Sequence, residues 1–328
     1  MDAHAPSSDA ADSDTAVWDQ YWRDGRLASC GGEGRSGYQA AIADGWRAFF
    51  AALAPGSRIL DACAGNGAVA RIAEEVAIAG GVLFDIDAFD SARIAPVQEN
   101  SSIRFQARVR AESTPYPAGV FDAVVGQYAI EYTALERTLP ELKRVSRPSG
   151  RVRFVVHARE GIVVAGARQQ LEDVRRFHET GDIFSAAREL ARARAAGSGS
   201  PRQEEFAARV RTCLENLHAA SQRSTDPVMF RDVADVIVHA LHAQRRSGTE
   251  AVLHKIDEAA ETVDAHEGRL SAMYRAALDE AGAIRLAERV SELWRRPAQT
   301  GRVQKPDGGL LGWSIETTSR SAGGGSPP

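Results

Sequence analysis

The sequence predicts an α/β fold in which a large helical segment interrupts alternating strands and helices. Between residues 55 and 157, short apolar runs typical of buried strands alternate with helical segments. A glycine-rich turn joins the first of these strands directly to a helix. From about residue 160 to 268 the chain is rich in Ala, Arg and Glu and has few strand-forming residues, which predicts helices.

Length and composition limit the class of protein. With 328 residues, 44% of them hydrophobic and 26% charged, the chain has the size of one large globular domain with a substantial insertion. A net charge of −4 gives no reason to expect a nucleic-acid partner. No apolar run approaches the ~18–20 residues that span a bilayer, and no signal peptide is recognisable. The cysteines, Cys30, Cys63 and Cys213, have no metal-binding spacing, so we expect free thiols, a cytoplasmic protein and no bound metal.

The region before the glycine-rich turn is aromatic. Residues 1–14 are polar and acidic and are expected to be disordered, as is the glycine- and proline-rich tail over residues 321–328. Residues 15–54 carry two aromatic trios at helical spacing, separated by a flexible loop over residues 30–37. The trios are Trp18, Tyr21 and Trp22, followed by Trp46, Phe49 and Phe50. We expect both trios to pack against the domain that follows.

Residues 59–67 are the most informative segment of the chain. They have the pattern of an apolar strand followed by a turn of small residues, and a helix begins directly after them. Gly65 and Gly67 allow a ligand to approach the backbone where a side chain would collide with it. The N-terminus of the helix directs free N–H groups and a positive dipole end toward that ligand. The turn therefore predicts a site for a nucleotide-like cofactor.

Two cofactors are compatible with this turn. A dinucleotide is indicated by the Gly65-x-Gly67-x-x-Ala70 pattern and by Asp85, which follows Gly65 at the spacing of a ribose-binding acid. S-adenosylmethionine is indicated by Asp61, four residues before Gly65. A carboxylate would repel a pyrophosphate but attract the ammonium and sulfonium groups of S-adenosylmethionine. Asp61 therefore favours S-adenosylmethionine, and NAD is the alternative.

A second strand is predicted over residues 81–87, ending in two acids. Because alternate strand residues face opposite ways, only one of Asp85 and Asp87 can point at the ribose hydroxyls. We assign this role to Asp85, and expect Asp87 to be solvated or to cap the next helix.

Two further strands are expected over residues 121–128 and 152–157, with a Pro/Gly turn between them that ends a helix. His157 ends the later strand, at the edge where the pocket of an open α/β sheet lies. It is therefore a candidate general base, with Glu131 and Tyr132 as further candidates beyond the earlier strand. Because methyl transfer can proceed by proximity and alignment alone, no catalytic residue is assigned.

The stretch over residues 159–268 is predicted to be a helical insertion. We expect helices over residues 162–178, 182–196, 202–222, 228–245 and 249–281. The insertion is interpreted as a substrate cap or a dimerisation surface, with a purely structural bundle as the alternative.

The segment over residues 269–320 is expected to return to the sheet. Residues 284–290 and 312–318 alternate between apolar and polar side chains, and turn residues lie between them at 306–309. This pattern predicts an antiparallel hairpin that closes the sheet, so the insertion interrupts one domain.

Five segments together resemble the motifs of class I S-adenosylmethionine-dependent methyltransferases, most closely the small-molecule group that includes quinone-biosynthesis enzymes (methyltransferase type 11). The segments are residues 60–67, 84–87, 111–117, 121–131 and 144–150, all within the stretch 55–158. The resemblance implies a Rossmann-like, seven-stranded, mostly parallel sheet with helices on both faces. It also implies that the first aromatic trio forms a lid over the cofactor.

The resemblance also implies roles for individual residues. The amino-acid end of the cofactor is assigned to Asp61, Ala62, Gly65, Asn66 and Gly67, the ribose to Asp85 and Ile86, and the adenine side and pocket floor to Ala111, Glu112 and Gln127. Two positions depart from the family pattern, since Cys63 replaces a glycine and Arg110 replaces the acid of the adenine loop. An arginine cannot accept the hydrogen bond of the adenine amino group, so adenine recognition should depend on backbone groups near Ala111 and Glu112.

The expected function is transfer of a methyl group from S-adenosylmethionine to an O, N or C atom of a small molecule by in-line displacement. A catalytically silent S-adenosylmethionine-binding sensor or scaffold is the first alternative, and an NAD-dependent oxidoreductase the second. The expected partners are a small-molecule substrate and a second copy of the chain, bound through the helical insertion.

Overall fold

The computed structural model describes residues 17–23, 25–27, 40–96, 101–197 and 199–318. The disorder expected for residues 1–14 and 321–328, and the loop at 30–37, lie outside the described residues. The chain divides into two compact units, a core unit of residues 1–166 and 272–328 and a helical unit of residues 167–271.

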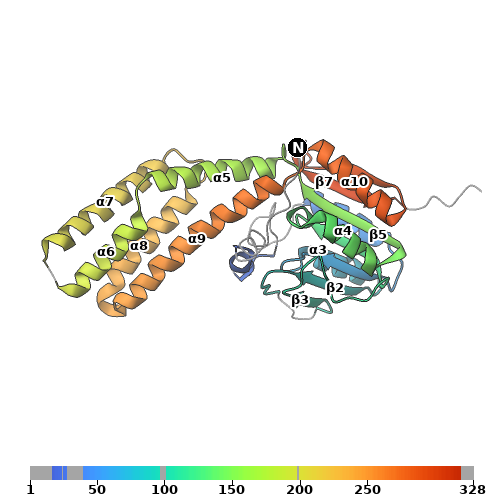
Figure 1. Cartoon of the computed structure of the whole chain (residues 1–328), viewed down its shortest axis with the longest axis horizontal. Coiled ribbons are helices and arrows are strands. Elements are labelled where there is room, and N and C mark those ends of the chain that lie inside the picture. The colour runs from blue at the N-terminus through green and yellow to red at the C-terminus, as the bar shows by residue number, and fades with distance from the viewer. Residues whose placement is uncertain (1–16, 24, 28–39, 97–100, 198, 319–328) are drawn as a thin grey trace, which may run out of the picture. The chain divides into compact units, whose positions relative to one another are not determined.

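A seven-stranded sheet forms the centre of the core unit, with strand order β3-β2-β1-β4-β5-β7-β6 (Figure 1). Strands β1 to β5 are parallel, and β7 runs antiparallel to both β5 and β6. The order reverses between β1 and β4, where open α/β sheets bind ligands beyond the carboxyl ends of the strands. The strands are β1 (Arg58–Ala62), β2 (Asp85–Asp90), β3 (Arg104–Ala107), β4 (Phe121–Gln127), β5 (Ser146–His157), β6 (Ala298–Gln304) and β7 (Leu310–Thr317).

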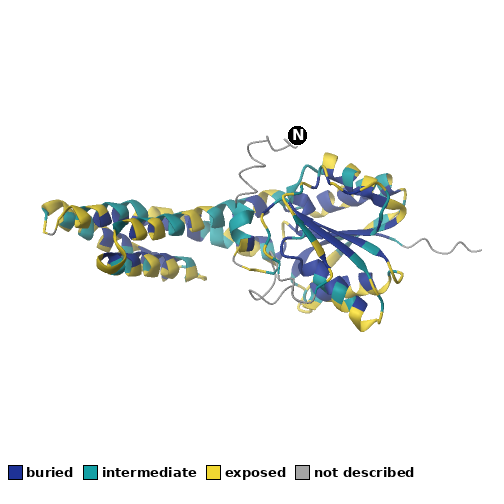
Figure 2. Cartoon of the chain, turned by 90° about the horizontal axis from the view of Figure 1, so that it is seen from below, coloured by how far each residue is buried: buried dark blue, intermediate teal, exposed yellow. Residues whose placement is uncertain are grey.

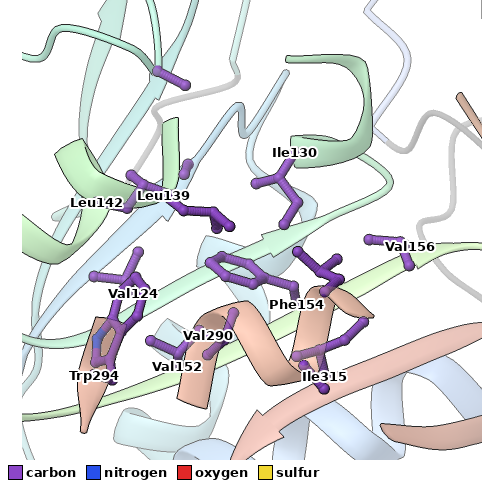
Figure 3. Close-up of a cluster of buried hydrophobic side chains, with 14 of the residues drawn as sticks. Val124, Ile130, Leu139, Leu142, Val152, Phe154, Val156, Val290, Trp294 and Ile315 are labelled. Carbon is purple, nitrogen blue, oxygen red and sulfur yellow. The ribbon is translucent and has the colours of Figure 1, made fainter. Parts of the chain in front are cut away.

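Helices cover both faces of this sheet. On one face α2 (Ala40–Ala51) and α3 (Ala68–Ala79) bury the second aromatic trio, with Trp46 fully inaccessible to solvent. On the other face α4 (Leu135–Val145) and α10 (Glu280–Trp294) pack on the central strands, and their apolar side chains point toward one another (Figure 3). The strands between these layers are largely buried (Figure 2). The predicted Rossmann-like sheet is therefore confirmed.

The strand predicted over residues 284–290 is wrong, because this segment lies within helix α10. Asp279 caps that helix by accepting a hydrogen bond from the N–H of Gly282 at 2.7 Å. Along it, Leu286, Val290 and Trp294 recur at helical spacing and face the core. The closing hairpin does form, but its first strand is β6, which follows the helix.

The second strand is also displaced from its predicted position. The strand was predicted over residues 81–87, whereas it begins at Asp85 and continues to Asp90. Asp87 is 2% exposed, and its carboxylate accepts hydrogen bonds from the guanidinium groups of Arg58 and Arg104 at 2.8–3.1 Å. These partners from β1 and β3 allow an acid to occupy the inside of a strand. The edge strand β3 was not predicted, because it is short and partly exposed.

The helical unit is built from five helices that pack around a hydrophobic core of their own. They are α5 (Ile162–Glu179), α6 (Ile183–Ala196), α7 (Pro201–Ser221), α8 (Val228–Ser247) and α9 (Thr249–Ala276). The last helix is shorter than predicted, since the N–H of Leu278 donates to the carbonyl of His157 instead of continuing the helix. None of the described helices is long and apolar enough to cross a membrane.

Candidate functional site

Backbone strain marks one edge of the sheet in the core unit. Among the described residues, four other than glycine have a positive φ, and three of them directly follow a strand. Cys63 follows β1 with φ 54°, Arg108 follows β3 with φ 62°, and Tyr128 follows β4 with φ 51°. Such conformations cost of order 1–3 kcal/mol each and gather at binding sites. The carboxyl edge of β1, β3 and β4 is therefore the candidate site.

The glycine-rich turn lies at this edge and is closely packed. Gly65 and Gly67 have φ values of 54° and 87°. A Cβ on Gly65 would lie 2.3 Å from the ring of Trp22, and a Cβ on Gly67 would lie 2.4 Å from the ring of Phe105. Both the conformation and the space therefore require glycine at these positions.

Asp61 is buried in β1 directly before the turn. Its Oδ2 accepts a hydrogen bond from the N–H of Ala70 at 3.0 Å, so the carboxylate holds the first turn of α3. Burial raises the pKa of Asp61 to about 8; the bond from Ala70 opposes this shift, and the charge of Asp90 adds to it. The acid predicted beside the glycine turn is thus in place, in an environment that favours an added positive charge.

The ribose assignment to Asp85 is contradicted by its position. Asp85 lies at the amino end of β2, opposite the candidate site, where its half-exposed carboxylate pairs with Arg104 at 2.5 Å and Arg58 at 3.4 Å. Its neighbour Ile86 is 2% exposed in the core, so neither residue predicted to bind the ribose reaches the site edge. The error follows from the displaced strand, since Asp85 was expected near the end of a strand over residues 81–87 and is instead the first residue of β2.

Asp90 occupies the position that the sequence assigned to Asp85. It ends β2, and its Oδ2 accepts a hydrogen bond from the N–H of Gly65 at 2.8 Å while its Oδ1 accepts one from Ala92 at 2.8 Å. Burial raises the pKa of Asp90 to about 6, against these backbone hydrogen bonds. The available signal was the buried Phe89 before it, which extends the apolar pattern by two residues.

The helical segment over residues 17–23 lies against the glycine turn. The amide of Asn66 donates to the carbonyls of Trp22 at 3.0 Å and Arg26 at 2.7 Å, and its Oδ1 accepts from Ala95 at 2.8 Å. Asp19 accepts a hydrogen bond from the N–H of Arg93 at 2.7 Å. Asn66, predicted to contact the cofactor, therefore anchors the N-terminal segment, and Ala62 is wholly buried at the end of β1.

The predicted adenine loop reaches the same edge. Ala111 is buried, and Glu112 accepts a hydrogen bond from the N–H of Ala134 at 3.1 Å. Arg110, half exposed, lies 3.5 Å from the Glu112 carboxylate. The loop joins the end of β2 through the N–H of Val109, which donates to the carbonyl of Asp90 at 3.0 Å. Arg110 therefore pairs with its own loop.

Gln127 ends β4 with an unsatisfied donor. Its Oε1 accepts a hydrogen bond from the indole N–H of Trp46, whereas its Nε2 has no partner among the described residues although Gln127 is only 5% exposed. A buried unsatisfied donor costs about 1–3 kcal/mol. A ligand acceptor at this edge would remove that cost.

His157, the candidate base, is buried at the end of β5. Its Nδ1 lies 2.8 Å from Oε1 of Glu131, and the same oxygen accepts the backbone N–H of His157 at 2.9 Å. Neither side chain is exposed, and the imidazole stacks on Tyr128 with ring centroids 4.0 Å apart. Tyr132 packs edge-on against the imidazole and against Trp18 of the N-terminal segment. Proton transfer between His157 and a bound molecule would therefore require these aromatic residues to move.

The raised pKa of Asp61 predicts a pH-dependent stability. The folded chain holds a proton on Asp61 between about pH 4 and 8, and the unfolded chain does not, so stability decreases as pH rises through this window. Asp61→Asn keeps the acceptor for Ala70 but has no proton to lose. As pH rises from 6 to 9, its free energy of unfolding should therefore decrease by roughly 2 kcal/mol less than that of the unsubstituted protein. Urea unfolding of the ligand-free protein at several pH values measures this difference. Equal slopes for the two proteins would contradict it.

Comparison with known families gives one match. Residues 35–196 match a protein family described as a methyltransferase domain. This segment contains β1 to β5 and thus all the site residues predicted from the sequence. No curated protein matched the chain.

Solved structures with partial similarity include three relatives. The chain is similar to the 1,6-didemethyltoxoflavin-N1-methyltransferase of Burkholderia thailandensis (19% identity, TM-score 0.36, covering 48% of this chain and 68% of that one). It is also similar to phosphoethanolamine N-methyltransferase 2 of Haemonchus contortus (12% identity, TM-score 0.35, covering 92% of this chain and 56% of that one). A third similar structure is PH0226 of Pyrococcus horikoshii OT3 (19% identity, TM-score 0.30, covering 34% of this chain and 53% of that one). The chain spans about half the length of the latter two.

Proposed function

Residues 35–196 match a methyltransferase domain, and the sheet has the fold of class I S-adenosylmethionine-dependent methyltransferases; from this premise we propose that the chain methylates an O, N or C atom of a small molecule. The observation that carries the proposal is the glycine turn between two buried carboxylates, Asp61 and Asp90. When bound, S-adenosylmethionine supplies a methyl group on a positively charged sulfur. The chain's own residues would bind and align it.

The residues present at the site fit this cofactor. Gly65 and Gly67 would receive the amino-acid end after the rings of Trp22 and Phe105 move aside. Asp61, which keeps its proton up to about pH 8 in the ligand-free chain, would lose that proton beside the ammonium group. Asp90, rather than Asp85, is the acceptor for the ribose hydroxyls, because it ends its strand beside the turn. The Nε2 of Gln127, which has no partner in the part of the chain that the structure describes, would donate to an acceptor of the ligand.

The chain contributes alignment and exclusion of water rather than strong acid–base chemistry. The segment over residues 17–23 covers the glycine turn with Trp22, which supports its role as a lid. The methyl group on a sulfonium is already activated. A nucleophile held in line with it can therefore react through proximity and alignment alone, without a general base. His157 remains the candidate base, available only after the aromatic residues around it move.

A catalytically silent binding protein is the second candidate function. The observation in its favour is the burial of the Glu131–His157 pair, which leaves the predicted base enclosed. An NAD-dependent oxidoreductase is disfavoured by the two acids beside the glycine turn, because Asp61, once ionised above about pH 8, and Asp90, above about pH 6, would repel a pyrophosphate. We propose that the helical unit takes part in substrate binding. Self-association through this unit is the alternative, and sedimentation velocity distinguishes the two.

The test is parallel calorimetric titration with S-adenosylmethionine, S-adenosylhomocysteine and NAD. We expect the first two to bind and NAD not to bind. Incubation with S-adenosylmethionine labelled in its methyl group and a panel of small nucleophiles then separates an enzyme from a silent binder, since only an enzyme transfers label. Binding of NAD without binding of S-adenosylmethionine would overturn the proposal.

A further inference from the structure

A pocket of about 640 Å³ lies in the core unit where helices α4 and α10 end, and we call it the α4–α10 pocket. Its lining includes Lys143 from the last turn of α4, Ser149 from the first part of β5, and Arg295 directly after α10. Strands β4 and β5 begin at this edge of the sheet, so the pocket lies at the opposite end from the candidate site. Its volume is in the range of about 300–1,000 Å³ that is usual for small-molecule sites.

Three residues that line the α4–α10 pocket are positively charged, namely Lys143, Arg295 and Arg296. The guanidinium of Arg296 donates hydrogen bonds to the carbonyls of Ser149 at 2.7 Å and Thr318 at 3.0 Å. The Nζ of Lys143 lies 5.7 Å from the ring centroid of Trp294. Carbonyl groups and an indole hold these side chains in place without neutralising them, so their positive charge remains at the pocket wall.

The acids near the ends of the two helices pair with other arginines, namely Glu141 with Arg144 at 2.6 Å and Glu292 with Arg289 at 3.1 Å. In the part of the chain that the structure describes, neither Lys143 nor Arg295 takes part in an ion pair. Burial and the charge of Arg295 lower the pKa of Lys143. The two cations therefore repel one another across a pocket in which an anion would stabilise both.

The C-termini of α4 and α10 account for only part of this positive charge. Each helix C-terminus carries about half a negative charge, and basic residues commonly offset it. Two such termini balance about one of the three positive charges and leave about two. A phosphate group carries about −1.5 to −2 at neutral pH, which matches the remainder.

Arg295 has a backbone conformation that favours glycine. It caps α10 with φ 51° and ψ 41°, and its N–H donates to the carbonyl of Glu292 at 3.3 Å. Helices commonly end in this left-handed conformation, usually on glycine or asparagine, because it is unfavourable for other residues. Strain of this kind gathers at functional sites. An arginine here therefore indicates that its side chain has a role which glycine could not fill.

We propose that the α4–α10 pocket binds a phosphate group between Lys143 and Arg295, either as free phosphate or as the phosphate of a small organic ester. The two cations would supply charge-assisted hydrogen bonds, and the Ser149 hydroxyl a further donor. Leu293 and Pro148, which also line the pocket, offer an apolar surface to the carbon part of an ester. This binding is independent of methyl transfer, because the candidate site lies at the other edge of the sheet.

Isothermal titration of the full chain with inorganic phosphate and with phenyl phosphate, at constant ionic strength, tests this proposal. We expect one saturable site, filled equally well in the presence and absence of excess S-adenosylmethionine. Tighter binding of phenyl phosphate would identify an ester as the ligand, and equal binding of the two would identify free phosphate. Absence of saturable binding, or its loss when S-adenosylmethionine is in excess, would overturn the proposal.

Two variants assign the binding to this pocket. Lys143→Gln and Arg295→Gly should each weaken phosphate binding by about fivefold or more, a reduced value because both side chains are at least partly exposed. Arg295→Gly should also keep or raise the Tm, because glycine suits the left-handed cap, so a loss of binding there cannot come from misfolding.

The matched control is Arg245→Gln, which removes a positive charge from the last turn of α8 and should leave the affinity for phosphate unchanged. Circular dichroism checks the fold of each variant, and Arg295→Gly alone decides if Lys143→Gln does not fold. Unchanged affinity in either folded pocket variant, or an equal loss in the control, would overturn the proposal.

Discussion

Replacing Asp90 by Ala is expected to weaken binding of S-adenosylmethionine roughly 10- to 150-fold, the equivalent of the 1.5–3 kcal/mol of a hydrogen bond to a charged group. Asp90 ends β2 beside the glycine turn and holds the N–H of Gly65 in place, so its loss removes an acceptor for the ligand and loosens the turn. Asp85→Ala, at the opposite end of the same strand, should change the affinity by less than about twofold, because its carboxylate pairs with two half-exposed arginines.

Calorimetric titration of both variants tests this contrast, with thermal unfolding as a control for folding. Asp90→Asn is a useful third variant, since it keeps one acceptor for the Gly65 N–H while removing the charge. If Asp85→Ala weakened binding as strongly as Asp90→Ala, the ribose assignment made from the sequence would be restored and the one argued from the structure would be wrong.

Gly67→Ala is expected to destabilise the protein by roughly 2–5 kcal/mol. A left-handed conformation costs an L-residue about 1–2 kcal/mol, and φ at this position is 87°. The added Cβ would also lie 2.4 Å from the ring of Phe105, and overpacking of this kind costs about 1–3 kcal/mol. Urea unfolding measures the sum.

A matched glycine separates the two contributions. Gly56 has a similar φ of 77°, but a Cβ there would meet nothing within 4 Å. Gly56→Ala should therefore lose only the conformational part, about 1–2 kcal/mol. Gly67→Ala combined with Phe105→Ala should cost less than the sum of the two single changes, because the collision is absent. Equal losses for the two glycine variants would show that Phe105 moves aside without cost.

The glycine turn was predictable because its signal is local. Asp61, Gly65 and Gly67 lie within seven consecutive residues, and the helix that completes the site follows directly. The position of β2 was not predictable in the same way. Its three acids obscure the apolar alternation, and Asp87 is accommodated only by arginines from neighbouring strands.

Contacts between distant segments account for the other differences. The alternation over residues 284–290 suggested a strand, and the helix is specified instead by its cap and by side chains that meet the core formed with α4. The buried pair of Glu131 and His157 joins residues 26 positions apart, one in the short helix after β4 and one at the end of β5. The sequence shows that a glutamate and a histidine are present but not that they are in contact. Their contact depends on which strands lie side by side in the sheet.

The hydrogen bond from the Tyr128 hydroxyl to the carbonyl of Leu311, 2.9 Å long, joins positions 183 residues apart and has a consequence for biosynthesis. The strained residue after β4 depends on β7, which the ribosome makes only after the whole helical unit. Domains generally fold as units during synthesis, and non-local pairings form late. A nascent chain that has not yet reached residue 310 therefore has a completed helical unit while the edge of β5 is still unpaired. Over that interval β5 is exposed to pairing with other chains. This is therefore the stage of synthesis at which a chaperone is most useful.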